Sequence, residues 1–191
     1  MNYNYGITGD IASGKSTLSN FLKELGFKVI DADLISREVM EPGERGYELV
    51  RAAFPQAFSK GQLDRKKLGD IIFSSPYERK RLDSILHPLI TEIMFERAGE
   101  GACFHDAPLL FEAGMDKNLK RIIYLSVDRD SQLDRIMRRD GLTEDQALSR
   151  MASFDYPREE KLRRSYVIEN NGNLEELKEK LIIFLEEEGL I

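Results

Sequence analysis

The segment Gly9–Ser16, GDIASGKS, constrains the fold of this chain more than any other feature. It fits the pattern G-x-x-x-x-G-K-[ST] of a phosphate-binding loop (P-loop), in which glycines let the backbone wrap closely around a phosphate. The mechanism requires a strand before the loop and a helix after it. The apolar run Tyr3–Thr8 precedes it, and the helical segment Lys15–Leu25 follows it. We therefore expect a nucleoside triphosphate to bind here.

The loop supplies several kinds of contact to ATP. Lys15 bridges the outer phosphates, Ser16 ligates Mg²⁺, and Thr17 reaches an inner phosphate. The alternative without a binding function is a glycine-rich turn with an incidental lysine. The predicted ATP-binding residues of the loop are Ile11, Ala12, Ser13, Gly14, Lys15, Ser16 and Thr17.

Short apolar runs alternate with helical segments along the chain, which is typical of parallel strands joined by helical crossovers. We expect an α/β fold, a P-loop three-layer sandwich with a five-stranded parallel sheet. The length of 191 residues is marginal for two cores, so a single domain is predicted. The predicted strands are Tyr3–Thr8, Phe27–Asp31, Gly101–Asp106, Arg121–Val127 and Ser165–Glu169.

Two connections exceed what a crossover helix requires. Residues 34–100 hold two predicted helices, Asp64–Phe73 and Pro76–Arg97, and are predicted to form a helical substrate-binding insert, with extra packing as the alternative. Residues 129–164 are predicted to form a helical lid. A last helix opens at Asn173 and ends in an acidic run predicted to be a solvated face. The remaining core comprises residues 1–33, 101–128 and 165–191.

Composition excludes several classes of protein. Lys and Arg total 28 against 34 Asp and Glu, so the net charge of −6 argues against general nucleic-acid or membrane binding. One cysteine, Cys103, and two histidines cannot form an internal disulfide or a Cys/His zinc cluster. The sequence shows no signal peptide and no apolar stretch long enough to span a bilayer. We expect a soluble, unprocessed, cytoplasmic monomer or small homo-oligomer.

Three carboxylates follow predicted strands and therefore lie at the carboxyl edge of the predicted sheet. Asp33 is the better candidate to orient an acceptor hydroxyl as a base, and Asp31 supports the loop geometry. The alternative is that Asp31 and Asp33 merely cap a helix beginning near Leu34. Asp106 is predicted to lie in the shell of a metal ion.

Phosphoryl transfer also needs cations over the phosphate oxygens. Arg135, Arg138 and Arg139 lie on one predicted helix, and Arg150 lies on the next, after a capping box at Thr143–Gln146. A lid that brings one or two of these arginines to the phosphates fits the pattern. A helix surface laced with ion pairs fits it equally well.

Several motifs occur in one order: Gly6–Gly9, Ser13–Thr17, Val29–Asp33, His87–Ile90, Pro108–Glu112, Arg138–Arg150 and Val167–Gly172. In this order and over its full length, the chain resembles the dephospho-coenzyme A kinases. The resemblance implies transfer of the ATP γ-phosphate to the ribose 3′-hydroxyl of dephospho-coenzyme A, the last step of coenzyme A synthesis. No single motif is diagnostic.

The resemblance also implies roles for matching residues. Lys15 and Ser16 would hold ATP and Mg²⁺, Asp33 would receive the hydroxyl proton, and the lid would supply Arg150 with Arg138 or Arg139. Asn170 and Gly172 would face adenine, although Asn-Gly is also an ordinary turn. His87 would face the acceptor, although His87-Pro88 could instead break a helix. The predicted substrate-binding residues are Thr8, Asp31, Asp33, His87, Pro108, Leu109, Leu110 and Glu112.

The chain departs from the family pattern at four positions. Asp10 and Ala12 stand where the family usually has glycine, and the charge of Asp10 has little effect only if its side chain points to solvent. Phe154 replaces a usual glutamine, and Ser165 stands where an Ala-Asp pair usually ends. These changes concern lid contacts and substrate affinity.

Two other functions remain open. A nucleoside or nucleotide kinase would share the loop, base and lid and differ only in its acceptor pocket. A non-catalytic ATP-binding scaffold would explain the departures, although a base at Asp33 beside Lys15 speaks against it. A GTPase is disfavoured because the chain lacks an N-K-x-D guanine motif.

Overall fold

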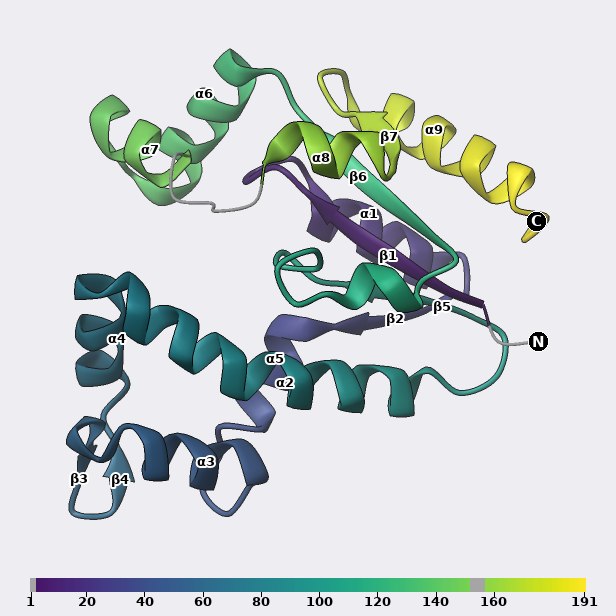
Figure 1. Cartoon of the computed structure of the whole chain (residues 1–191). Helices are drawn as coiled ribbons and strands as arrows, with labels where there is room; N and C mark the ends of the chain where they lie inside the picture. Colours follow the sequence, from purple (N-terminus) through teal and green to yellow (C-terminus); the bar gives the residue numbers. More distant parts are fainter. Residues whose placement is uncertain (1–2, 152–156) are drawn as a thin grey trace. The chain divides into compact units, whose positions relative to one another are not determined.

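A computed structural model describes residues 3–151 and 157–191. The chain forms two compact units (Figure 1). The first combines Met1–Ile30 with Ala98–Ile191, and the second is Asp31–Arg97. Each is described separately below.

The first unit is built on a five-stranded sheet, as predicted. The strand order is β2-β5-β1-β6-β7, and β1 pairs in parallel with both β5 and β6. Ile7 lies opposite Asp106 on one side and Ile123 on the other. The central strand therefore delivers the phosphate loop to the carboxyl edge of the sheet, where ligands bind in open α/β folds. The strands are β1 Tyr3–Gly9, β2 Lys28–Asp31, β5 Ala102–Asp106, β6 Arg121–Ser126 and β7 Tyr166–Glu169.

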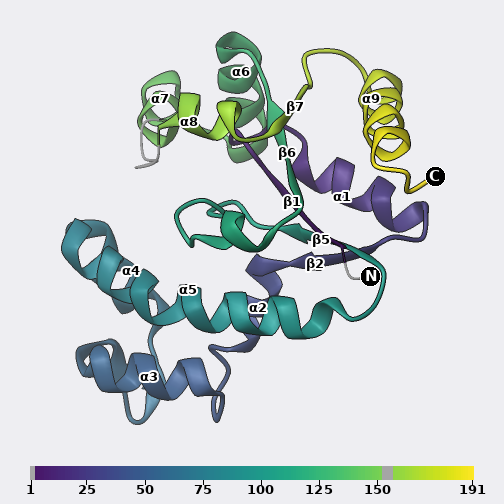
Figure 2. The ribbon, with the colours of Figure 1, turned by 45° about the vertical axis from the view of Figure 1, so that its right-hand side comes forward.

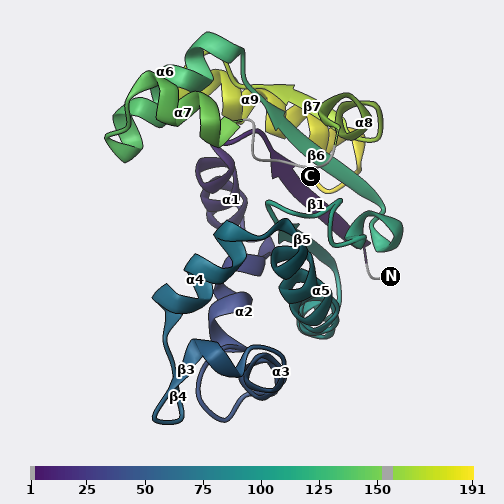
Figure 3. The same cartoon turned by 60° about the vertical axis from the view of Figure 1, so that its left-hand side comes forward.

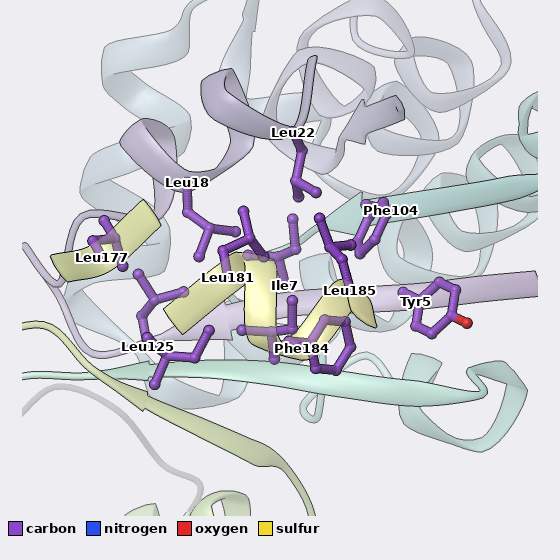
Figure 4. Close-up of a cluster of buried hydrophobic side chains, with 12 residues drawn as sticks. Tyr5, Ile7, Leu18, Leu22, Phe104, Leu125, Leu177, Leu181, Phe184 and Leu185 are labelled. Carbon is purple, nitrogen blue, oxygen red and sulfur yellow. The ribbon is translucent and has the colours of Figure 1, made fainter. Parts of the chain in front are cut away.

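Two helices bury their apolar sides on one face of this sheet. Figure 2 shows α1 (Lys15–Glu24, purple) beside α9 (Leu174–Glu187, yellow). The predicted cap at Asn173 is confirmed, since its side chain accepts a hydrogen bond from the Glu176 backbone N–H. Burial of apolar surface between α1, α9 and the sheet is the main stabilising term here. The core of this face, drawn in Figure 4, comprises Tyr5, Ile7, Leu18, Leu22, Phe104, Ile123, Leu125, Ile168, Leu177, Leu181, Phe184 and Leu185.

The acidic run at the end of α9, Glu186–Glu188, is not a uniformly solvated face, so that prediction is wrong at one residue. The side chain of Glu188 is only 8% exposed and pairs with Lys120 at 2.8 Å and Arg121 at 2.7 Å. Burial pushes the pKa of Glu188 up, but the hydrogen bonds from Lys120, Arg121 and Tyr5 outweigh it, so the pKa is lowered. The carboxylate thus ties the end of the chain to β6.

The remaining helices of the first unit lie before and after β6 in the chain. Figure 3 shows α6 (Arg129–Asp140) beside α7 (Glu144–Met151). The predicted capping box is present, because Thr143 N–H donates to Gln146 Oε1 at 3.0 Å and Gln146 N–H donates to Thr143 Oγ1 at 3.4 Å. The short helices η2 (Met115–Asn118) and α8 (Arg158–Arg163) complete this unit.

The second unit is helical, with one small hairpin that the sequence pattern did not predict. Tyr47 packs edge-on against Phe58 of the hairpin, and Arg81 lies over the ring of the buried Phe54. Helix α5 continues through Pro88, so the predicted alternative of a helix break there is wrong. The elements are α2 Ala32–Glu38, α3 Arg45–Ala53, η1 Pro55–Ala57, β3 Phe58–Ser59, β4 Gln62–Leu63, α4 Arg65–Ser74 and α5 Pro76–Ala98.

Candidate active site at the phosphate loop

The shape of the phosphate loop depends on residues without room for a side chain. A Cβ atom on Gly9 would lie 2.4 Å from the backbone oxygen of Leu125. Gly14 has φ +95°, and a Cβ there would lie 2.5 Å from Asn170 Nδ2. Ala12 also has a positive φ, 59°, a backbone conformation that favours glycine. The loop is therefore wound tightly against β6 and the residues after β7.

Side chains from distant elements hold the carbonyl groups of the loop. Gln132 Nε2 donates to Ile11 O at 3.1 Å, and Arg135 Nη1 donates to Ala12 O at 3.5 Å. Arg135 Nη2 also donates to Asn170 O at 2.9 Å, directly after β7. The buried Asn170 side chain donates to Ser13 O at 2.7 Å. In the described part of the chain, no side chain caps α1 at Gly14. The first N–H groups of α1 thus lack a side-chain cap, as an anion site at a helix N-terminus requires.

Lys15 begins α1 and faces the end of β5. Its Nζ lies 3.4 Å from Asp106 Oδ1. The buried Ser19, one turn further along α1, donates to Asp106 Oδ2 at 2.7 Å. The carboxylate and the ammonium are therefore already oriented toward each other at the loop.

The oxygen donors at this place suit magnesium. Ser16 offers an exposed hydroxyl and Asp106 a carboxylate, both of the hard oxygen type that Mg²⁺ prefers. Within residues 3–151 and 157–191, no cluster of three or more His, Cys, Asp or Glu could hold a metal ion alone. The two oxygen donors leave the other positions of an octahedral Mg²⁺ shell to water and to the phosphates of a nucleotide.

Asp10 does not point to solvent. Its side chain is 7% exposed and forms a bidentate ion pair with Arg158, with both N–O distances at 2.9 Å. Tyr124 Oη donates to the same carboxylate at 2.6 Å, and Val127 N–H donates at 3.2 Å. Sequence reasoning did not identify Tyr124 or Arg158, and the unexpected charge at position 10 was the only signal for a partner.

These residues line a cavity of about 680 Å³ in the first unit. The walls come from the loop, the end of β6 and helices α6 to α8, and include Gly9, Asp10, Ile11, Tyr124, Gln132 and Arg158. Burial and the hydrogen bond to Asp10 both raise the pKa of the Tyr124 hydroxyl. Tyr124 is therefore neutral and serves as a hydrogen-bond donor.

The predicted lid arginines lie on helices α6 and α7, as expected, and three of them, Arg138, Arg139 and Arg150, are paired with acids. Arg138 is highly exposed and lies 3.0 Å from Asp134, one turn earlier. Arg139 and Arg150 both contact Asp140, at 2.9 Å and 2.8 Å. The hydrogen bond from Arg139 is the main reason that the pKa of Asp140 is lowered.

The predicted acceptor loop after β5 is partly buried. Thr8 Oγ1 donates to Pro108 O at 3.2 Å, which ties the loop to β1. Leu110 is fully buried beneath Gly6, whereas Leu109 is exposed. Glu112 pairs at 2.7 Å with the buried Lys161 of α8.

Asp31, Asp33 and His87 belong to the second unit. The Asp31 carboxylate caps α2, accepting from the N–H groups of Asp33 at 2.8 Å and Leu34 at 3.2 Å. Asp33 is exposed in the first turn of α2, and His87 lies 3.7 Å from Asp83 on α5. The capping alternative is thus confirmed for Asp31, with the helix beginning at Ala32.

Three further positions that the sequence analysis singled out are Phe154, Ser165 and Gly172. Phe154 lies outside the described residues. Ser165 lies directly before β7, and Gly172 lies in the turn before α9.

Among the described helices, none is both long and apolar enough to cross a membrane.

Comparison with known proteins relates the whole chain to one family. The family model described as dephospho-CoA kinase matches residues 3–176. The dephospho-CoA kinase of Geobacillus kaustophilus is 41% identical over 98% of this chain and 97% of its own length. That of Geobacter sulfurreducens is 42% identical over 92% of this chain and 93% of its own length.

Solved structures agree with this relation. The dephospho-CoA kinase of Campylobacter jejuni has a TM-score of 0.70 at 30% identity, covering 98% of this chain and 97% of its own. A Thermus thermophilus protein reaches a TM-score of 0.81 at 34% identity, covering 97% of both chains. A shikimate kinase of Acinetobacter baumannii, at 17% identity and a TM-score of 0.55, shares the fold. With its phosphate loop intact and relatives aligned over nearly its full length, the chain belongs to the dephospho-CoA kinase family.

Proposed function

We propose that this chain transfers the γ-phosphate of ATP to the ribose 3′-hydroxyl of dephospho-coenzyme A, producing coenzyme A and ADP. Family membership over nearly the full length carries the proposal. The pairing of Lys15 with Asp106 supports it, because this ammonium lies at the start of α1, where the loop would hold phosphates. The chain thus acts in the last step of coenzyme A synthesis, in the cytoplasm, as a monomer or small homo-oligomer.

In this proposal the phosphate loop binds ATP. The contacts come from the backbone of Ile11–Gly14 and the side chains of Lys15, Ser16 and Thr17, while Asn170 and Gly172 border adenine. The hydrogen bond from Asn170 to Ser13 supports this placement, because it joins the loop to the segment after β7. Ser16 and Asp106 hold Mg²⁺ directly or through water, and the ion neutralises charge on the phosphates when bound.

The remaining residues act on the acceptor and on the transferred group. Asp33 receives the proton of the attacking hydroxyl, and its exposure in the first turn of α2 leaves it accessible. Residues 34–100 form the substrate-binding insert, and residues 129–164 form the lid. Arg150 and either Arg138 or Arg139 exchange their present carboxylate partners for phosphate oxygens.

Acceptor contacts are proposed in each unit separately. Thr8 and the loop Pro108–Glu112 contribute from the first unit, with Leu109 exposed and Glu112 paired with Lys161. Asp31 and His87 contribute from the second unit, where Asp31 also maintains the start of α2 and thus the setting of Asp33.

Coupled ADP release from purified protein with Mg-ATP tests the function. Rates are compared without acceptor, with dephospho-coenzyme A, and with adenosine, AMP or CMP. Strong and selective stimulation by dephospho-coenzyme A is expected. Stimulation by a mononucleotide instead would make the chain a nucleotide kinase, and ATP binding without stimulated turnover would make it a scaffold.

A further inference from the structure

The carboxylate of Asp10 introduces a negative charge directly into the loop that receives a polyanion. A glycine at this position would carry no charge and need no partner. A buried carboxylate near the ATP phosphates would oppose their binding, because like charges in a low-dielectric site repel strongly. Some group must therefore offset the charge of Asp10.

Arg158 is the group that can do so. Its Nε and Nη2 atoms approach the Asp10 oxygens side-on at 2.9 Å each, the bidentate geometry in which a guanidinium binds a carboxylate most strongly. Arg158 comes from α8, far along the chain from the loop, and lines the same cavity as Asp10. The hydrogen bond to Asp10 raises the pKa of the Arg158 guanidinium further, so the cation is permanent.

The other partners of Asp10 do not carry charge. The hydroxyl of Tyr124 and the backbone N–H of Val127 both donate to the carboxylate, at 2.6 Å and 3.2 Å. They would hold the carboxylate in place if Arg158 were removed, but they would leave its negative charge uncompensated. Geometry and charge at Asp10 are thus maintained by different groups, and mutation can separate them.

We propose that Arg158 is a positioning residue that neutralises Asp10, so that the phosphate loop admits ATP despite a carboxylate beside it. The proposal deepens the ATP-binding part of the proposed function and rests on it. It predicts that Arg158 matters only because Asp10 is charged. Removing both charges should therefore restore the ATP affinity that is lowered when Arg158 alone is removed.

The test measures Mg-ATP affinity by calorimetry, without acceptor, for a double-mutant cycle. Arg158→Gln should weaken ATP binding about 10-fold, because the Asp10 charge is then unpaired. Asp10→Asn keeps the contacts of Tyr124 and Val127 and should leave affinity within about threefold of the unmutated protein. The double variant Asp10→Asn/Arg158→Gln should return to the same range.

Several controls separate charge from structure. Arg158→Lys keeps the positive charge but loses the bidentate geometry of the guanidinium, and it should retain most of the ATP affinity. Arg164→Gln removes a cation from the end of the same helix α8, where it pairs with Asp116, and should not change ATP affinity. The defect of Arg158→Gln should also shrink as ionic strength rises, because salt screens the uncompensated charge. In the kinase assay the defect should appear in KM for ATP, with kcat nearly unchanged.

Four results would overturn the proposal. A double variant as weak as Arg158→Gln would mean that Arg158 contacts the phosphates itself. Equal losses of ATP affinity in Asp10→Asn and Arg158→Gln would mean that the ion pair only stabilises the structure. Normal ATP affinity in Arg158→Gln would mean that Arg158 has no role in ATP binding. An Arg158→Lys protein that binds ATP as weakly as Arg158→Gln would show that the bidentate geometry matters and the charge does not. Since binding is measured without acceptor, an error in the proposed acceptor would leave these results readable.

Discussion

Lys15 and Asp106 face each other across the start of α1 and the end of β5, with Nζ 3.4 Å from Oδ1. Ser19 fixes the second carboxylate oxygen at 2.7 Å, so the carboxylate cannot rotate freely away from the lysine. A lysine that is oriented before nucleotide arrives loses less side-chain entropy on binding. This arrangement is the physical basis for the first two predictions.

Lys15→Ala should impair both ATP binding and turnover, because its charge meets the phosphates in the ground state and in the transition state. We expect kcat/KM to fall by roughly 10²-fold or more. Calorimetry with Mg-ATP and the coupled ADP assay measure the two effects. Normal activity in this variant would contradict the assignment of the loop.

Asp106→Asn should preserve the hydrogen bond from Ser19, since an amide oxygen also accepts, but lose the charge that faces Lys15 and that is proposed to hold Mg²⁺. We expect kcat to fall by about 10-fold or more and the Mg²⁺ concentration for half-maximal activity to rise. A magnesium titration at saturating ATP measures this. Ser19→Ala is the matched control: it removes the buried hydrogen bond and should cost about 1 kcal/mol of stability with little change in magnesium dependence.

Asp33→Asn should lower kcat by roughly 10²-fold or more while leaving ATP affinity nearly unchanged, because in its proposed role as base Asp33 acts only on the acceptor hydroxyl. Asp31→Ala is a contrasting variant nearby. It removes the cap of α2 and should cost about 1 kcal/mol of unfolding free energy. Steady-state kinetics and thermal unfolding distinguish the two aspartates, and an unchanged kcat in Asp33→Asn would remove Asp33 from the base role.

His105 predicts a pH dependence of stability rather than of catalysis. Its side chain is fully buried, with Nε2 2.9 Å from Asn4 Oδ1, and burial lowers its pKa from 6.5 to about 4. The unfolded chain therefore takes up a proton below pH 6.5 while the folded chain does not, so stability should fall as pH drops from 6.5 toward 4. The total loss from this group is about 3 kcal/mol.

Unfolding in urea at several pH values measures this loss, with His105→Gln as the comparison. Glutamine has no titratable group, so the unfolding free energy of the His105→Gln variant should fall less steeply between these pH values. Equal slopes in the two proteins would show that His105 is not responsible.

Local features of the chain were predictable because they depend on neighbouring residues. The strand, loop and helix around Gly9–Ser16, the cap at Asn173 and the capping box at Thr143 follow from motif, periodicity and side-chain chemistry over a few residues. All five sheet strands were found to within about two residues, the usual uncertainty of element ends. The hairpin at Phe58–Leu63 was missed because its strands are too short for alternation to appear.

Pairings between distant residues were not predictable in the same way. Nothing near Asp10 indicates that Arg158 completes its ion pair, nor that Asn170 holds Ser13, or that Glu188 is buried against Lys120. The sequence alone determined the five sheet strands, the phosphate loop and the family, because each is encoded in short-range patterns and their order. Only the tertiary structure decided which charges are compensated and which polar groups brace the loop, because that depends on which side chains the packed sheet and helices bring within hydrogen-bond distance.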